Sequence, residues 1–143
     1  MNQVEIFYKR LEVAIEHQTR CSKAWLIGDD IIFVECKANA EIELEDAKED
    51  MELSQELIAN VSRYGTIIDT ANIKSISKEA RDWYSQVQND NPHNICVALV
   101  VNSFYTRIIA NFFLGFSNSR TEMKIFNIKD DAVEWLYEKL KNS

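Results

Sequence analysis

The chain has 143 residues, of which 46% are hydrophobic and 27% charged, and its formal net charge is −7. This length predicts one domain, residues 1–143, with a core large enough to fold without a metal or disulfide. Three glycines and one proline exclude collagen-like and Gly-rich low-complexity sequence. The basic residues form no cluster, so we expect no nucleic-acid partner.

The negative charge is concentrated in one segment. Residues 41–56 contain eight acids and one base, so their net charge of −7 equals that of the whole chain. We expect this segment to form the solvated face of a helix. The alternative is a docking surface for a basic partner.

The cysteines and the first residues bear on localisation. Cys21, Cys36 and Cys96 are odd in number and widely spaced, which is typical of reduced thiols in a cytoplasm. The first residues lack the basic and apolar regions of a secretory signal, and no stretch approaches the ~20 apolar residues of a spanning helix. The sequence therefore predicts a cytoplasmic protein without membrane insertion.

The first half of the chain predicts alternating helices and strands. Residues 2–16 fit a helical stripe better than a strand, so we expect an N-terminal extension, residues 1–19, that is helical. Two apolar runs, 23–27 and 31–36, flank a Gly-Asp-Asp turn and predict a β-hairpin. Apolar residues three and four apart predict a helix over about 44–62, and a strand follows at 66–70. Ser77 is placed to cap the next helix, which runs through Val87.

The second half continues this alternation. Seven apolar residues, 95–101, predict a strand covered on both faces and central in the sheet. We expect a helix over 104–116, a strand over 123–126 and a last helix from Asp130. Together these elements predict an α/β fold with four or five flanking helices. Its mixed, mostly parallel sheet has about five strands and an N-terminal antiparallel hairpin.

The residues that could support catalysis are few. His17, Cys21 and Cys36 could supply three soft metal ligands, but structural zinc takes four, often from paired Cys-x-x-Cys motifs that the sequence lacks. Cys96 lies in the most apolar strand, where burial raises a thiol's pKa and lowers its reactivity. The three glycines form no phosphate-binding motif. We therefore expect no metal, no cofactor and no catalytic residue, although a weak enzyme site of distant polar residues would leave no linear trace.

Polar residues gather where the strand at 66–70 ends and the next helix begins. In open α/β sheets this edge binds ligands and partners, partly because helix N-termini attract anions. The alternative is that these residues only make turns and caps. The candidate binding residues here are Asp69, Thr70, Asn72, Ser75, Ser77, Lys78 and Arg81, and Asn102 is added at the end of the strand at 95–101.

The expected helix over 104–116 is unusually apolar. Its aromatic and aliphatic residues fill an arc of about 180°, whereas about 100° suffices to bury a helix against one layer. Ser103, Arg107 and Asn111 line the opposite side and are further binding candidates. The apolar side either packs in the core, contacts a partner or second copy, or covers a pocket for a small apolar ligand or lipid. The candidate homodimer contacts are Tyr105, Ile109 and Phe113.

The run Thr66-Ile-Ile-Asp-Thr-Ala-Asn-Ile-Lys-Ser-Ile-Ser77 resembles a segment of STAS-like domains, the fold of bacterial anti-sigma-factor antagonists. In that family an apolar strand ends in Asp, and apolar residues follow four and seven positions later. Asp69, Ile73 and Ile76 match these positions. The resemblance covers about residues 20–140, and the stretches after residue 96 also resemble a small uncharacterised bacterial subgroup of this fold.

One departure from the family limits what the resemblance implies. The antagonists open the following helix with Asp-Ser-Ser-Gly, whereas this chain has Ser77-Lys78-Glu79-Ala80, so the phosphorylated serine does not carry over. The resemblance implies a non-enzymatic domain whose α/β face binds another protein, and it does not imply sigma-factor control. The leading hypothesis is a cytoplasmic interaction or regulatory domain. A small-molecule or lipid binder with a pocket under helix 104–116 is the alternative.

Overall fold

The computed structural model describes residues 1–87, 92–104 and 121–142, and it contains a six-stranded sheet in the order β1-β2-β3-β5-β7-β8. The strands of this sheet are β1 (His17–Gln18), β2 (Ser22–Ile27), β3 (Ile31–Cys36), β5 (Tyr64–Asp69), β7 (Asn94–Val100) and β8 (Glu122–Phe126). A separate pair of short parallel strands is formed by β4 (Glu41–Ile42) and β6 (Ser75–Ile76). The helices are α1 (Gln3–Val13), α2 (Leu44–Leu57), α3 (Lys78–Val87) and α5 (Lys129–Asn142).

The strand directions confirm a mixed, mostly parallel sheet with an antiparallel N-terminal hairpin. Strands β3, β5, β7 and β8 run parallel to one another, and β2 pairs antiparallel with both β1 and β3. Gly28 has a φ of 62° in the β2–β3 turn, a conformation that residues with a side chain rarely adopt. The hairpin therefore forms where the sequence predicts it.

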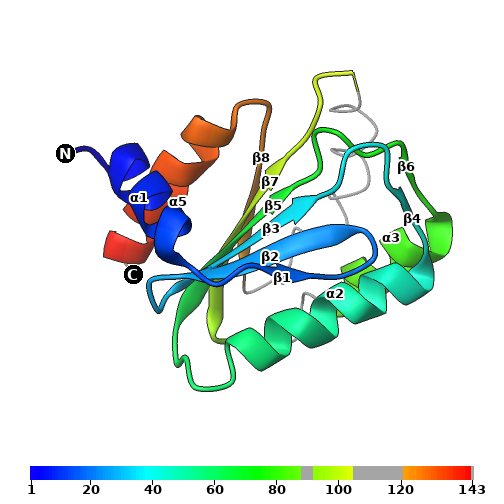
Figure 1. Cartoon of the computed structure of the whole chain (residues 1–143), viewed down its shortest axis with the longest axis horizontal. Helices are drawn as coiled ribbons and strands as arrows, with labels where there is room; N and C mark the ends of the chain where they lie inside the picture. Colours follow the sequence, from blue (N-terminus) through cyan, green and yellow to red (C-terminus); the bar gives the residue numbers. More distant parts are fainter. Residues whose placement is uncertain (88–91, 105–120, 143) are drawn as a thin grey trace.

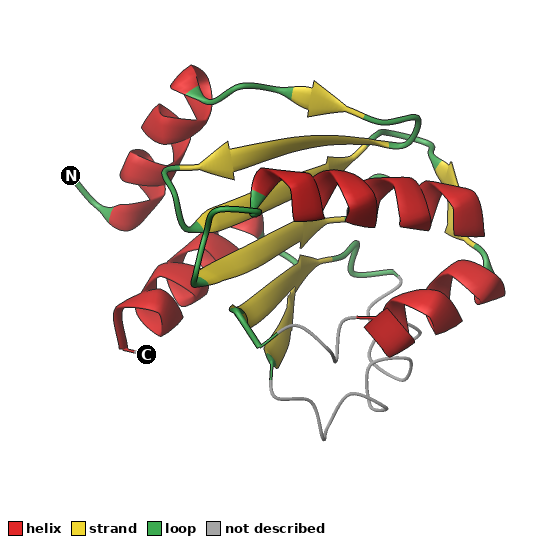
Figure 2. Ribbon diagram, turned by 90° about the horizontal axis from the view of Figure 1, so that it is seen from below, coloured by secondary structure: helices red, strands yellow, loops and turns green. Residues whose placement is uncertain are grey.

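The sheet lies between two layers of helices. Helices α1 and α5 cover one face, and α2 and α3 cover the other (Figures 1 and 2). We call these the α1/α5 face and the α2/α3 face. The parallel connections β3-α2-β5 and β5-α3-β7 place both crossover helices on the same face, as right-handed crossovers between successive strands require.

The α1/α5 face is packed with aromatic rings. Phe7 of α1 is fully buried, its ring centroid lies 5.4 Å from that of Phe33, and Phe33 stacks on Trp25 at 5.2 Å. Helix α5 approaches the sheet so closely that a Cβ on Gly65 would lie 2.9 Å from Leu136 Cδ1. The N-terminal helix that the sequence predicts is thus present and contributes to this core.

The α2/α3 face is aliphatic and includes more polar groups. Ile32 and Val34 of the sheet pack against Leu53 and Leu57 of α2. The short β4–β6 sheet lies at the start of both helices, because β4 is followed by α2 and β6 by α3. It places the beginnings of both helices at the same end of the sheet.

Several details differ from the expectations. Helix α2 ends at Leu57 rather than near residue 62, because the chain turns toward β5. Strands β1, β4 and β6 were not predicted, since two residues are too few to show a period of two. Strand β7 lies one position inside the edge strand β8 rather than at the sheet's centre. Apart from residue 104, the expected helix over 104–116 lies outside the described residues.

The helices in the described part of the chain are too short or too polar to cross a membrane. Within residues 1–87, 92–104 and 121–142, no helix combines the length and the apolar character needed to span a bilayer.

Candidate functional site

The loops that follow the four parallel strands meet at one end of the sheet. We define the carboxyl edge as residues 37–40, 70–74, 102–104 and 127–128, which follow β3, β5, β7 and β8. Backbone hydrogen bonds join these loops in sequence. The Asn39 N–H donates to the Asn72 carbonyl at 2.8 Å, the Thr70 N–H to that of Val100 at 2.8 Å, and the Val101 N–H to that of Phe126 at 2.9 Å. These bonds hold the ends of the four strands, and the residues that follow them, side by side.

Three predicted site residues lie in the carboxyl edge or next to it. Asp69 is buried at the end of β5, and its carboxylate accepts the Ala71 N–H at 3.0 Å. The Thr70 hydroxyl donates to the carbonyl of Val100 at 2.8 Å. The Ser77 hydroxyl accepts the Ala80 N–H at 3.1 Å and caps α3, as the sequence predicts. Turn formation and capping, the alternative kept open for this cluster, describe these three side chains.

The other predicted residues within the described ranges are more accessible. Asn72, Ser75, Lys78, Asn102 and Ser103 are exposed and Arg81 is half-buried. Lys78 forms an ion pair with Asp82 one turn along α3, at 3.1 Å, so its charge is partly neutralised. The candidates Tyr105, Arg107, Ile109, Asn111 and Phe113 lie outside the described residues.

The carboxyl edge also carries residues that sequence reasoning missed. Phe104 and Ile128 are 82% and 59% exposed, and the exposed Asn39 and Asn127 join Asn72 and Asn102 along the same edge. An asparagine therefore follows each of the four parallel strands within three residues. That spacing is visible in the sequence, but it becomes meaningful only when the strands are known to be adjacent.

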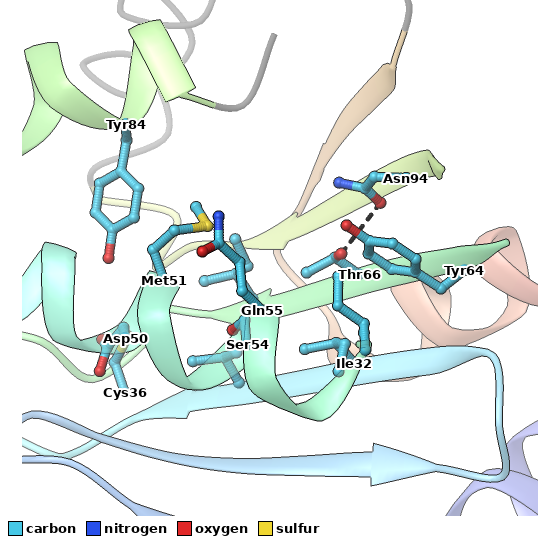
Figure 3. Close-up of a pocket in the computed structure, with 13 residues that line it drawn as sticks. Ile32, Cys36, Asp50, Met51, Ser54, Gln55, Tyr64, Thr66, Tyr84 and Asn94 are labelled. Carbon is cyan, nitrogen blue, oxygen red and sulfur yellow. Dashed lines mark hydrogen bonds between the residues drawn. The ribbon is translucent and has the colours of Figure 1, made fainter. Parts of the chain in front are cut away.

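A cavity of about 90 Å³, partly open to solvent, lies on the α2/α3 face (Figure 3). Side chains from β3, β5, β7, α2 and α3 line it. The polar residues of this cavity, among them Thr66, Tyr84 and Asn94, were not predicted, since they come from three different elements. Helix 104–116, under which the sequence predicts a pocket, lies outside the described residues apart from residue 104, so that expectation stays a prediction.

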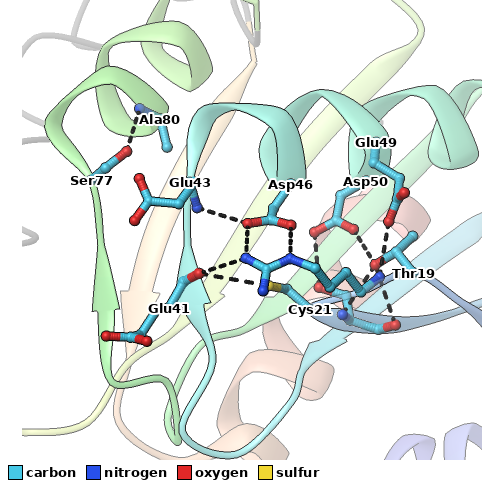
Figure 4. Close-up of polar contacts among 11 residues, drawn as sticks. Thr19, Cys21, Glu41, Glu43, Asp46, Glu49, Asp50, Ser77 and Ala80 are labelled. Atoms are coloured by element: carbon cyan, nitrogen blue, oxygen red, sulfur yellow. Dashed lines mark hydrogen bonds and ion pairs between the residues drawn. The ribbon is translucent and has the colours of Figure 1, made fainter.

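Two residues of the acidic segment are buried, so the expectation of a wholly solvated face is wrong for them. Asp46 accepts two hydrogen bonds from the Arg20 guanidinium, from Nε at 2.7 Å and from Nη2 at 2.6 Å (Figure 4). Asp50 accepts hydroxyl hydrogen bonds from Thr19 at 2.5 Å and Ser22 at 2.8 Å. Both carboxylates point inward because they are four residues apart and in phase with Leu53.

The remaining acids of this segment are exposed, as expected: Glu41, Glu43, Glu45, Glu49, Glu52 and Glu56. The Arg20 hydrogen bond holds the pKa of the buried Asp46 at about 2, whereas burial raises the pKa of Asp50. Asp46 also accepts the Glu43 N–H at 2.9 Å at the start of α2. The inward side of α2 therefore anchors the turn between β1 and β2, and its outward side remains acidic.

The three thiols are poor nucleophiles where they lie. All three cysteines are free and buried. Burial raises the pKa of Cys36 and that of Cys96 to about 12, and it raises the pKa of Cys21 as well. Among the residues that the structure describes, no three His, Cys, Asp or Glu side chains are grouped to hold a metal ion.

Comparisons with known proteins address the fold. The model of a family described as "Domain of unknown function (DUF7793)" matches residues 24–140. No curated protein matches the chain. A solved structure of an uncharacterised DUF3478-family protein from Shewanella loihica PV-4, which has a SpoIIAA-like fold, matches with a TM-score of 0.54 at 18% identity. That match covers 87% of this chain and 92% of the other, and it confirms the predicted STAS-like fold.

Proposed function

Since this chain belongs to the DUF7793 family and has a SpoIIAA-like fold, we propose that it is a non-enzymatic interaction domain that binds a protein partner through its carboxyl edge. The observation that carries the proposal is the exposure of Phe104 and Ile128 at that edge. Both follow adjacent parallel strands, since Val100 of β7 pairs with Phe126 of β8.

The chemistry around these two side chains suits a protein surface. Interfaces commonly combine exposed apolar residues with a polar, uncharged surrounding, because burying unpaired charges is costly. Asn39, Asn72, Asn102 and Asn127 supply uncharged polar groups at this edge, and amides can both donate and accept hydrogen bonds. The lysines of the edge have partners, since Lys74 pairs with Glu41 and Lys37 donates to the Thr19 carbonyl. Leaving a phenylalanine 82% exposed forgoes part of the roughly 1.5–3 kcal/mol that burial gives, which a partner could supply.

The absence of an activated nucleophile among the described cysteines supports a non-enzymatic role. The raised pKa values of Cys21, Cys36 and Cys96 keep these thiols protonated near neutral pH. At the carboxyl edge, the Asp69 carboxylate, the Thr70 hydroxyl and the Ser77 hydroxyl each have a backbone hydrogen-bond partner. These groups shape the edge instead of presenting a reactive group to a substrate.

The test is quantitative affinity capture from the natural host with wild-type chain and two double variants. Phe104→Asp/Ile128→Asp places charge on the carboxyl edge. Val13→Asp/Ile15→Asp is the matched control, because these residues are also large, apolar and exposed, at 84% and 76%, but lie at and just beyond the end of α1. We expect a protein that is retained by wild type and control and lost with the edge variant.

Two further measurements make the result decisive. Circular dichroism melting must show that both variants remain folded. Light scattering at about 100 µM separates self-association from binding to another protein, because specific interfaces have dissociation constants well below this. If the same proteins are recovered at the same level with all three forms, the carboxyl edge is not the interface.

A further inference from the structure

The cavity on the α2/α3 face is chemically different from the carboxyl edge. Its walls are the apolar side chains of Ile32, Val34 and Ile68 from the sheet, Met51 from α2 and Ile58 directly after α2. No Lys, Arg or His is among the described residues that line it. Against these described residues an anionic ligand would lose its hydration without gaining a positive partner, so they favour an uncharged ligand over a phosphate or carboxylate.

The one carboxylate at the cavity is already satisfied. Asp50 accepts hydrogen bonds from Thr19 and Ser22, which approach from the β1–β2 side. A metal ion would need several such ligands, and among the described residues that line the cavity Asp50 is the only acid. The ligand chemistry that remains is uncharged.

Hydrogen-bonding groups stand at two places in this cavity. The Tyr84 ring extends from α3 toward α2 and the sheet, and the Thr66 hydroxyl donates to the Asn94 side-chain oxygen at 3.2 Å (Figure 3). Neither the Tyr84 hydroxyl nor the Asn94 amide nitrogen has a hydrogen-bond partner among the described residues. Burial raises the pKa of Tyr84 well above its usual value, so this hydroxyl keeps its proton and remains a donor.

The size of the cavity limits the ligand to a small ring. Pockets for drug-sized ligands occupy roughly 300–1,000 Å³, and an enclosed cavity of roughly 150 Å³ holds benzene. About 90 Å³ with an opening to solvent accommodates part of one ring, while the rest reaches toward the opening. A rigid ring also suits Met51 and Tyr64, because thioethers and aromatic rings make favourable contacts with ring faces and edges.

We propose that this cavity binds an uncharged single-ring molecule that carries a hydroxyl group, with its ring against Val34, Ile68 and Met51 and its oxygen accepting a hydrogen bond from Tyr84. The site is separate from the carboxyl edge, and it does not depend on the proposed protein partner.

The test uses benzyl alcohol, toluene and benzoate as probes, followed by the methyl NMR signals of the Ile, Val and Met residues. Benzyl alcohol should shift the signals of Ile32, Val34 and Met51 and saturate with a dissociation constant on the order of 1 mM, as expected for a ligand this small. Benzoate should shift them at least tenfold more weakly. Toluene should bind more weakly than benzyl alcohol, because it has no hydroxyl group to accept the hydrogen bond from Tyr84.

Two conservative variants locate the hydrogen bond. Tyr84→Phe should weaken the affinity for benzyl alcohol by about 2- to 10-fold, the effect of one lost hydrogen bond, and leave the affinity for toluene unchanged. Tyr137→Phe is the matched control, because its buried hydroxyl, which has no hydrogen-bond partner in the described part of the chain, lies on the α1/α5 face. Equal losses in both variants, benzoate binding as tight as benzyl alcohol, or shifts confined to α1/α5-face methyls such as Val133 would each overturn the proposal.

Discussion

The two faces of the sheet differ in how closely their side chains pack and in how many polar groups they bury. On the α1/α5 face, Phe7, Trp25 and Phe33 interlock, and Gly65 allows α5 to approach the strands closely. On the α2/α3 face, the helices leave a cavity and buried carboxylates with hydroxyl and guanidinium partners. The first arrangement maximises contact and gives stability. The second buries polar groups among apolar ones, and such groups can recognise a ligand.

The largest expected effect is on the packed face. Phe7→Ala removes a fully buried ring and should lower the free energy of unfolding by about 3–5 kcal/mol. Urea denaturation measures the loss. Val13→Ala in the same helix is the control, since Val13 is 84% exposed and its truncation should change stability by less than about 0.5 kcal/mol. Similar small effects for both variants would mean that α1 is not part of the core.

The next effect tests the carboxylates of the α2/α3 face. Asp46→Ala should lower the free energy of unfolding by more than about 1 kcal/mol, the usual loss for a helix cap, because Asp46 also binds Arg20. The folded-state pKa of Asp46 is about 2, below its unfolded value of about 4, so its stabilisation is present above pH 4. The difference between wild type and variant should therefore shrink as the pH falls from about 4 to 2.

Asp50 should show the opposite dependence. Its pKa is raised in the folded state, so protonation stabilises the fold, and this contribution is lost as the pH rises through the folded-state pKa. Asp50→Asn should thus lose more stability relative to wild type near pH 4 than at pH 7. Glu45→Gln, at an exposed acid of the same helix, is the control for removing one negative charge from α2. Parallel pH profiles for the Asp46 and Asp50 variants would contradict the two assigned environments.

A smaller effect is expected where α5 touches the sheet. Gly65→Ala places a methyl group 2.9 Å from Leu136 Cδ1, and such overpacking costs about 1–3 kcal/mol. The reduced freedom of the unfolded chain offsets about 0.4–1 kcal/mol, so we expect a net loss of about 1 kcal/mol. Leu136→Val should reduce this loss in the double variant. If the stability losses of Gly65→Ala and Leu136→Val simply add in the double variant, Leu136 is not the residue that the new methyl group displaces.

The smallest change in stability is expected at the start of α3, near the carboxyl edge. Lys78→Ala removes an exposed ion pair with Asp82 and should cost about 0.3–0.5 kcal/mol. Lys48→Ala on α2, which removes the exposed pair with Glu45, should cost the same. If Lys78 belongs to the partner surface, captured partner should fall with Lys78→Ala alone. Equal capture with both variants would place Lys78 outside the interface.

Local sequence determined most of the secondary structure. The Gly-Asp-Asp turn between apolar runs forms the predicted hairpin, and Ser77 caps α3 as expected. The apolar run from residue 95 is a buried strand, although it begins at Asn94 and lies one position from the edge. Such features depend on neighbouring residues, and periodicity reveals them.

Tertiary structure decided the sites, because their members are distant in the chain. Asp46 and Asp50 were expected on a solvated face, and only the position of the β1–β2 turn shows why they are buried. Tyr84, Asn94 and Val34 line one cavity although they come from three elements, and no linear motif predicts that arrangement. The sequence alone set the alternation of strands and helices, since each element follows from local patterning. Three-dimensional packing set the rest, because burial and polar pairing depend on which elements become neighbours.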